Sequence, residues 1–255
     1  EGAAYEDGRG VSVWDRFSHT PGRVFEGHTG DVSCDHYHLL ESDLDLMASL
    51  GIRNYRFSVS WPRLMPEGTG KVNEKGVSFY NRMIDGLVRR GIRPFMTLFH
   101  WDYPVALQQR GSWENPDSPN WFEDFVALCA KRFGDRVHDF IPFNEPQCFI
   151  GLGYAAGAHA PGLMLPLDAV IPMSHHVLLA NGKAVDVLRQ TVRGARVSYA
   201  PCGDMMMPLT QVREDIDAAR TAYFDIPEDD DRRLWNVSWW SDPVMLGEYP
   251  ADGLQ

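Results

Sequence analysis

Side chains able to perform acid–base chemistry follow an apolar segment at residues 144–146, which read Asn-Glu-Pro. A carboxylic acid such as Glu145, held between apolar residues and beside an amide, suits general acid–base catalysis. Burial raises the pKa of a carboxyl group, so a buried acid can hold a proton near neutral pH and deliver it. A structural reading is also open, in which Glu145 caps the next helix or pairs with an arginine. The tripeptide alone does not decide between the two.

A second polar group, His-Trp-Asp at residues 100–102, ends the preceding apolar segment. His100 can hydrogen-bond a hydroxyl group and Trp101 offers an apolar ring face, which suits a sugar with its polar edges and C–H faces. Simple packing at the end of a strand would also account for both residues. Arg56 is a third signal, because a guanidinium inside an otherwise apolar segment needs a partner, most simply a carboxylate.

Four short segments rich in β-branched or aromatic residues predict the buried strands that position these groups: 54–60, 93–100, 139–144 and 196–200. Amphipathic patterns between them predict helices that end at Gly51, Gly91 and Gly134, the first of them capped by Asp35. Further helices are expected over about 175–191, after Pro172, and about 214–224. This alternation is typical of a parallel sheet covered by helices, either a barrel or an open doubly wound sheet.

The position of the polar residues, at successive strand ends followed by long aromatic-rich loops, favours a (β/α)₈ barrel. Marker residues in the predicted strands, Arg56, Leu98, Phe143 and Tyr199, lie on average about 48 residues apart, and eight such units would need on the order of 380 residues. The chain has 255 residues and no linker-like tract. We therefore expect one domain over residues 1–255 that forms part of a barrel. Its open edge is expected to leave inner apolar residues such as Phe57, Leu98 and Phe143 partly uncovered.

The composition excludes several classes of partner. A net charge of −11 disfavours nucleic acid and anionic membrane surfaces, which both need clustered Lys and Arg. No apolar run approaches the length of a membrane span, and no leader pattern opens the chain. The four cysteines, Cys34, Cys129, Cys148 and Cys202, are widely spaced without a C-x-x-C pair, which predicts a reducing compartment, the cytoplasm.

Three other motifs resemble cofactor or metal sites. Residues 34–38, with His28 nearby, have metal-ligand residue types, but His36 and His38 are expected on a helix and would point apart. His175 and His176 are adjacent and are expected to pack. Residues 151–156 match G-x-G-x-x-[GA] but do not follow a strand directly, and no acidic residue ends a following strand. We therefore expect no metal and no dinucleotide cofactor.

Ordered motifs along the whole chain lie at residues 6–22, 30–38, 55–63, 91–104, 143–146, 159–162 and 241–243. Together they closely resemble glycoside hydrolase family 1, the β-glucosidases. The resemblance implies a (β/α)₈ barrel, of which this chain carries roughly strands two to five with their helices. It also implies hydrolysis of β-glycosidic bonds with retention of configuration. In that reaction one carboxyl group protonates the leaving oxygen and a second, about 5 Å away, attacks the sugar carbon.

The resemblance assigns a role to each residue singled out above. Glu145 resembles the general acid/base, and Asn144 resembles the amide that holds the sugar 2-hydroxyl. His100 resembles the ligand of the ring hydroxyls, with Trp101 beside it. Arg56 resembles the arginine that supports the nucleophile. The implied partner is a small β-glucoside or short oligosaccharide, without metal, cofactor, nucleic acid or membrane, and with oligomerisation left open.

The departures from the family pattern are also informative. The (I/V)-T-E-N-G motif of the nucleophile does not occur, and the first strand with its sugar-binding Gln is missing. Gln147 stands where many members carry Trp. These losses at both ends predict a piece of a longer enzyme whose nucleophile lies outside the chain. The alternatives are a 6-phospho-β-glucosidase or β-galactosidase, a non-catalytic half-barrel that binds sugar or a partner, and an NAD-dependent oxidoreductase using residues 151–156.

Overall fold

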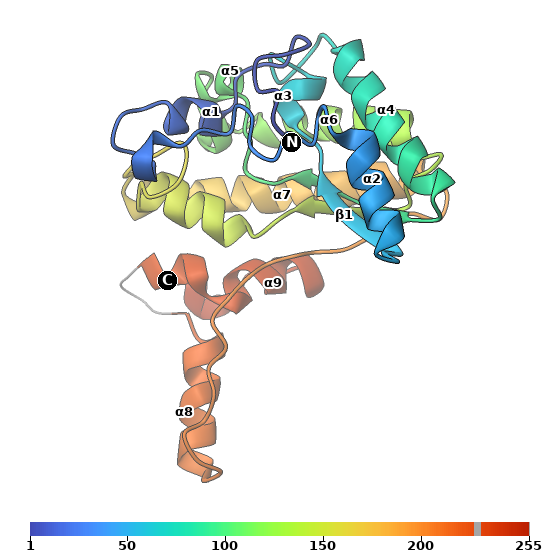
Figure 1. The fold of residues 1–255 in the computed structure, drawn as a ribbon. Coiled ribbons are helices and arrows are strands. Elements are labelled where there is room, and N and C mark those ends of the chain that lie inside the picture. Colours follow the sequence, from blue (N-terminus) through green and yellow to red (C-terminus); the bar gives the residue numbers. More distant parts are fainter. Residues whose placement is uncertain (227–230, 255) are drawn as a thin grey trace. The chain divides into compact units, whose positions relative to one another are not determined.

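The computed structural model describes residues 1–226 and 231–254 (Figure 1). These residues form two compact units. The first comprises Glu1–Asn144 and Leu179–Tyr199, and the second comprises Glu145–Leu178 and Ala200–Gln255. The single domain expected over residues 1–255 stays a prediction.

A parallel four-stranded sheet lies in the first unit, in the order β1-β2-β3-β4. Its strands are β1 (Asn54–Ser58), β2 (Arg93–Phe99), β3 (Asp139–Phe143) and β4 (Arg196–Val197). Each strand begins where the sequence predicts and ends one to three residues earlier. Because every strand pairs with the next one in the chain, the order is that of a barrel wall, whereas a doubly wound sheet reverses its order at a switch point.

Helices of the first unit follow the predicted alternation: α1 (Val13–Ser18), α2 (Leu40–Ser49), α3 (Trp61–Leu64), α4 (Glu74–Arg89), α5 (Val105–Gln108) and α6 (Ser118–Phe133). Helices α2 and α4 lie against each other (Figure 1). Gly51 and Gly91 follow these two helices with φ near +70°, a conformation that costs glycine little. The predicted ends of both helices are therefore confirmed.

The expectation that Asp35 caps the first predicted helix is wrong. Asp35 has a φ of +53°, and its carboxylate lies 2.5 Å from Nδ1 of His38. Helix α2 begins only at Leu40 and has no side-chain cap. His36 and His38 therefore lie in a turn before the helix, so the helical argument that they point apart does not apply.

Helix α7 (Leu167–Thr191) also differs from the prediction, because it begins before Pro172 and includes it. Pro172 is the sixth residue of the helix, where it removes one backbone hydrogen bond and crowds the carbonyl four residues earlier, but the helix continues past it to Thr191. The proline was therefore a poor marker of the helix start.

The apolar residues expected to be uncovered at the open edge are buried. Phe57 is 7% exposed, and Leu98 and Phe143 are 0% exposed. Phe143 packs on Phe122 of α6, with ring centroids 4.4 Å apart. The expectation that these apolar side chains are partly uncovered is therefore wrong. In β1, by contrast, the polar Arg56 is exposed.

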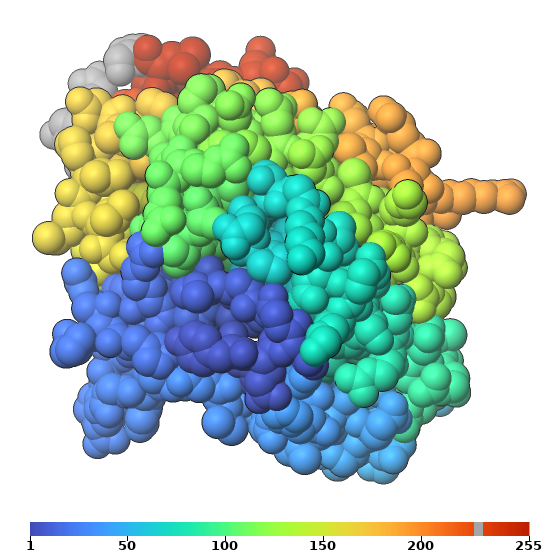
Figure 2. All heavy atoms as spheres, turned by 90° about the horizontal axis from the view of Figure 1, so that it is seen from above, coloured from blue at the N-terminus to red at the C-terminus, as the bar shows by residue number. Residues whose placement is uncertain are grey.

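The N-terminal segment is attached to the residues after β1 by a buried arginine. Arg63 is 0% exposed, lies 2.5 Å from the Glu1 carboxylate, and donates to the carbonyl oxygens of Gly2 and Ala3. Tyr80 donates to the other Glu1 oxygen at 2.7 Å. Figure 2 shows this segment, in dark blue, against the cyan residues that follow β1. The start of the chain is thus part of the folded core of this unit.

The second unit is mainly helical, with a π-helical segment η3 (Cys148–Ala155), α8 (Arg213–Phe224), the short η4 (Asp231–Trp235), α9 (Val237–Met245) and the short η5 (Ala251–Leu254). Asn236 caps α9 by accepting from the backbone N–H groups of Ser238 and Trp239. Trp239 donates to Ser174 Oγ at 3.1 Å, which joins α9 to α7. In the described part of the chain no helix is both long and apolar enough to cross a membrane.

Candidate active site

The predicted sugar-binding residues of the first unit follow the carboxyl ends of β2 and β3. Phe99 and Phe143 are paired in register, and the pairing continues one residue further, because Asn144 N–H donates to the Phe99 carbonyl at 3.0 Å. Trp101 then donates from its indole Nε1 to the Asn144 carbonyl at 2.8 Å. The two motifs found in the sequence, around residues 100 and 144, are therefore in direct contact.

Arg56 joins the same group from β1. Its Nε donates to Thr97 Oγ1 at 2.9 Å, and its Nη2 donates to Asn144 Oδ1. The carboxylate partner expected from the sequence is therefore not found among the described residues. The exposure of Arg56 lowers the cost of keeping its charge without a counterion, and two neutral oxygens accept from its Nε and Nη2 atoms. Thr97 was not identified from the sequence; the pairing of Ser58 with Thr97 is what brings it close.

The contact with Arg56 also orients the Asn144 amide. Since Oδ1 accepts from a guanidinium, the oxygen faces Arg56 and the NH₂ group is directed to the other side. Asn144 is 4% exposed, which limits its freedom to turn. An amide held in this way can donate to a hydroxyl oxygen of a ligand.

Trp101 has an unusual backbone, with a φ of +78°. A bulky residue in the left-handed region is strained, and such strain often occurs at functional sites. Its ring meets that of His100 edge to face, with centroids 5.2 Å apart. The exposed His100 side chain and the half-exposed indole thus form a polar group beside an apolar surface.

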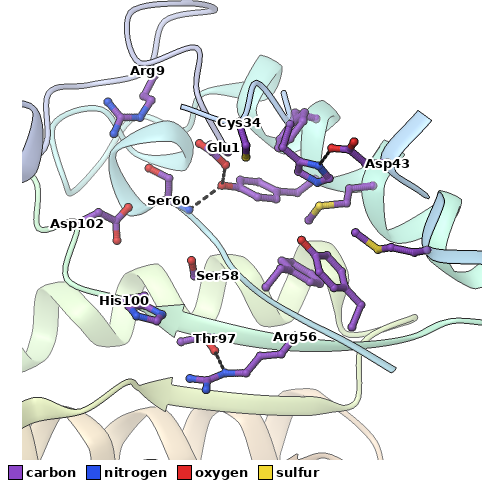
Figure 3. Close-up of a pocket in the computed structure, with 17 residues that line it drawn as sticks. Glu1, Arg9, Cys34, Asp43, Arg56, Ser58, Ser60, Thr97, His100 and Asp102 are labelled. Carbon is purple, nitrogen blue, oxygen red and sulfur yellow. Dashed lines mark hydrogen bonds and ion pairs between the residues drawn. The ribbon is translucent and has the colours of Figure 1, made fainter. Parts of the chain in front are cut away.

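A pocket of about 640 Å³ opens beside these strands in the first unit. Figure 3 shows Arg56 and Thr97 at its base, with His100 and Asp102 at one side. Burial raises the pKa of Asp102 to about 7, against the opposing effect of the nearby Arg9 guanidinium. Among the described residues, Asp102 Oδ1 has no hydrogen-bond partner. The pocket thus contains a carboxyl group with a pKa near neutrality. The sequence places Asp102 after a strand but does not predict this raised pKa.

Glu145 belongs to the second unit and follows Asn144 directly in the chain. Its φ is +43°, and its N–H donates to the Ala200 carbonyl at 2.8 Å. The following helical segment has Gln147 at its N-cap and no side-chain cap. Within residues 1–226 and 231–254 no arginine or lysine pairs with Glu145. The structural reading of Glu145 as a helix cap or ion-pair partner is therefore not supported.

Two thiols lie beside the Glu145 carboxylate. Cys148 and Cys202 have their sulfur atoms 3.6 Å apart, and an oxygen of Glu145 lies within 4.8 Å of both. The hydrogen bond between the two thiols lowers the pKa of Cys202 and raises that of Cys148. The sequence contained no local signal for this pairing, because the two cysteines are 54 positions apart.

Gln147, which stands where many family members carry Trp, holds the backbone of Cys202 in place. It is 0% exposed, its Nε2 donates to the Cys202 carbonyl at 2.7 Å, and its Oε1 accepts from the Cys202 N–H at 3.3 Å. The amide thus satisfies both backbone groups of Cys202. An indole at this position has no acceptor and could not make both bonds.

The glycine-rich residues 151–156 are unlike a dinucleotide site. Residues 151–155 lie inside the π-helical segment η3, whereas a dinucleotide fingerprint needs a turn between a strand and a helix. Gly151 packs against Trp235, and Gly153 packs against the Ala160 carbonyl. Close packing explains these glycines.

The family model, the curated relatives and the solved structures that this chain matches all indicate the same family. The model of glycosyl hydrolase family 1 matches residues 1–255. The chain is 43% identical over 255 residues to Beta-glucosidase A of Acetivibrio thermocellus, covering 100% of this chain and 54% of that protein. It is 41% identical over 250 residues to Beta-glucosidase A of Thermotoga maritima, covering 98% of this chain and 54% of that protein.

The fold agrees with solved structures of the same group. A beta-glucosidase from Thermotoga maritima in complex with deoxynojirimycin has a TM-score of 0.88 and 41% identity, covering 98% of this chain and 54% of the other. The same enzyme in complex with glucoimidazole also has a TM-score of 0.88. The chain thus spans about half the length of the curated relatives it matches. The predicted fold, a part of a (β/α)₈ barrel, and the resemblance read from the motifs are both confirmed.

Proposed function

Because the chain belongs to glycosyl hydrolase family 1, we propose that it carries the acid–base half of a retaining β-glucosidase. The relatives described above are named beta-glucosidases, and the chain covers about half of each. The complete reaction therefore belongs to a longer protein that includes residues 1–255. Its nucleophilic carboxylate lies outside them.

Each predicted residue has a definite task in this reaction. Glu145 protonates the glycosidic oxygen as the bond to the aglycone breaks, and its carboxylate later takes a proton from the water that releases the sugar. The Asn144 amide donates to the sugar 2-hydroxyl, and His100 binds ring hydroxyls beside Trp101. Arg56 holds the Asn144 amide and supports the carboxylate that attacks the anomeric carbon.

One observation carries this proposal more than any other. Asn144 accepts a hydrogen bond from Arg56 of β1 through its side chain and another from Trp101, which follows β2, through its backbone carbonyl. Asn144 and Trp101 directly follow the carboxyl ends of neighbouring parallel strands, where barrel enzymes place their active sites. Glu145 is the next residue after Asn144. The chemistry follows from this position in the chain together with the family membership.

For the substrate we propose plain β-glucosides or short β-linked oligosaccharides. In support, two further relatives are named 1,4-beta-D-glucan glucohydrolase, and the matched Thermotoga maritima enzyme was solved with deoxynojirimycin. We propose that the reaction needs no metal or cofactor, because two carboxyl groups complete the double displacement. The sparse cysteines and acidic charge support the cytoplasm as its location.

The proposal is tested by assaying the full-length protein on aryl β-glucosides, aryl β-galactosides and their 6-phosphates. We expect the unphosphorylated aryl β-glucoside to be hydrolysed faster than the other substrates, and Glu145→Gln to lose most of this activity. For a substrate whose aglycone is a very good leaving group, the activity lost in Glu145→Gln should be smaller, because its departure needs little protonation. Absence of turnover on all of these substrates would rule the proposal out.

A second candidate is a non-catalytic half-barrel that binds a sugar or a partner. It is favoured by the pocket beside His100 and Arg56, which lies wholly in the first unit and does not involve Glu145. The mass of the natural protein separates the two candidates. A mass near 29 kDa favours the binding module, and a mass near that of a complete barrel favours the enzyme.

A further inference from the structure

Three side chains with metal-binding atoms meet in the second unit. The carboxylate of Glu145 and the sulfur atoms of Cys148 and Cys202 all lie within 4.8 Å of one another. Within the described residues this is the one group of three or more His, Cys, Asp or Glu side chains with such spacing. We propose that it binds a thiophilic divalent cation, Zn²⁺ in the cell.

The geometry agrees with tetrahedral coordination. Two thiolates about 2.3 Å from one tetrahedral zinc ion lie about 3.8 Å from each other. The sulfur atoms of Cys148 and Cys202 are already 3.6 Å apart, so both can bind one ion with little movement. The Glu145 oxygen supplies a third ligand, and a water molecule completes the fourth position. All three residues are partly exposed, which gives the ion access.

The backbone holds the three ligands in place before any ion binds. Cys148 N–H donates to the Glu145 carbonyl at 3.0 Å, and Glu145 N–H donates to the Ala200 carbonyl at 2.8 Å. The buried Gln147 amide holds both backbone groups of Cys202. Because the fold already fixes the segments that carry the ligands, binding loses little conformational entropy.

The ligand types select the metal. Two thiolates favour Zn²⁺ and other thiophilic ions, whereas Mg²⁺ and Ca²⁺ require oxygen ligands. No oxidation occurs, and each thiol that binds releases one proton to solvent. A disulfide between Cys148 and Cys202 is the competing use of the same two sulfur atoms, and it would remove the site.

Binding at this site has a consequence that rests on the proposed function. A metal ion on the Glu145 carboxylate competes with the proton that this group is proposed to deliver. Zn²⁺ is therefore expected to inhibit the full-length enzyme reversibly, with chelator restoring activity. Metal binding itself does not depend on the hydrolytic function and is measured separately.

The test is a titration of the reduced, chelator-treated full-length protein that contains residues 1–255 with Co²⁺ under anaerobic conditions. We expect one Co²⁺ per chain, with a sulfur-to-cobalt charge-transfer band in the near ultraviolet and intense visible bands of a tetrahedral ion. Addition of Zn²⁺ should remove both. Cys148→Ser and Cys202→Ser should each reduce the charge-transfer intensity by about half and weaken binding by at least about tenfold.

Two further variants make the assignment specific. Glu145→Gln should weaken Co²⁺ binding while leaving the charge-transfer band, since both thiolates remain. Cys34→Ser, which removes an exposed thiol of the first unit, is the matched control and should change nothing. The proposal is overturned if the wild-type chain gives no charge-transfer band, if the band is lost only in Cys34→Ser, or if the two thiols are found as a disulfide under reducing conditions. Hydrolysis by the full-length protein without the cobalt band would refute the metal site and leave the proposed function intact.

Discussion

Arg56 donates a hydrogen bond from its guanidinium to the side-chain oxygen of Asn144, linking the first and third strands of the sheet through their side chains. The middle strand takes part, because Thr97 accepts from the same guanidinium at 2.9 Å. The Arg56 guanidinium thus reaches from β1 across β2 to the residue after β3, and it orients the Asn144 amide. This contact makes Arg56 a positioning residue for Asn144.

Replacement of Arg56 by lysine tests this role. Lysine keeps the charge but loses the planar fork that reaches two acceptors, so the Asn144 amide is no longer held. We expect kcat/KM of the full-length enzyme on an aryl β-glucoside to fall by about tenfold or more. Arg53→Lys, at an exposed position just before β1, is the matched control and should retain activity. An Arg56→Lys enzyme with unchanged kinetics would contradict the role.

The 1–255 chain alone should not hydrolyse glycosides at an enzymatic rate. Double displacement needs a carboxylate on the opposite side of the anomeric carbon from the acid, and the family's nucleophile motif does not occur in this chain. The measurement compares this chain with its Glu145→Gln variant on an activated aryl β-glucoside. Equal rates near background are expected. Rapid turnover that disappears in the variant would reveal a nucleophile within residues 1–255.

Asp139 should stabilise the first unit in a pH-dependent way. Arg196 and Arg93 both donate two hydrogen bonds to its carboxylate, at 2.6 to 2.8 Å, and they lower its pKa. Asp139→Asn should therefore reduce the free energy of unfolding at pH 7 by about 1–2 kcal/mol, a modest value because both arginines are half exposed.

The sign of the pH dependence follows from the lowered pKa. The contribution of Asp139 is fully present above the unfolded pKa of about 4 and is lost as the pH falls through the folded value. Urea denaturation of wild type and Asp139→Asn should therefore converge in acid. Asp135→Asn, which removes an exposed carboxylate paired with Arg136, should cost less than about 0.5 kcal/mol. A difference between wild type and Asp139→Asn that persists unchanged at low pH would argue against this account.

Asp102 should have the opposite pH dependence. Its folded pKa is raised to about 7, so the folded protein holds a proton that the unfolded chain releases near pH 4. The free energy of unfolding should therefore fall between about pH 4 and pH 7, and Asp102→Asn should remove this slope. Urea denaturation across this range measures it. Asp124→Asn, at an exposed position of α6, should keep the wild-type slope, and an equally steep slope in Asp102→Asn would contradict the assignment.

Local sequence patterns determined most of the elements and indicated the candidate site residues. Short segments rich in β-branched and aromatic residues predicted where β1, β2 and β3 begin, because such residues favour the extended backbone of a strand. Gly51 and Gly91 predicted helix ends because both have a positive φ that other residues avoid. The motifs around residues 100 and 144 predicted neighbouring groups, and the register of β2 with β3 brings them into contact.

Only the tertiary structure decided which side chains meet across long separations. The partners of Arg56, the raised pKa of the Asp102 carboxyl and the contact of Cys148 with Cys202 all depend on strand register, burial and loop paths. Local patterns misplaced the cap at Asp35, where the backbone is left-handed. Residue type limits what a side chain can do, but its neighbours and its exposure to water set its charge and its partners. The residue types able to do chemistry were therefore readable from the sequence, whereas the contacts that tune these side chains required the fold.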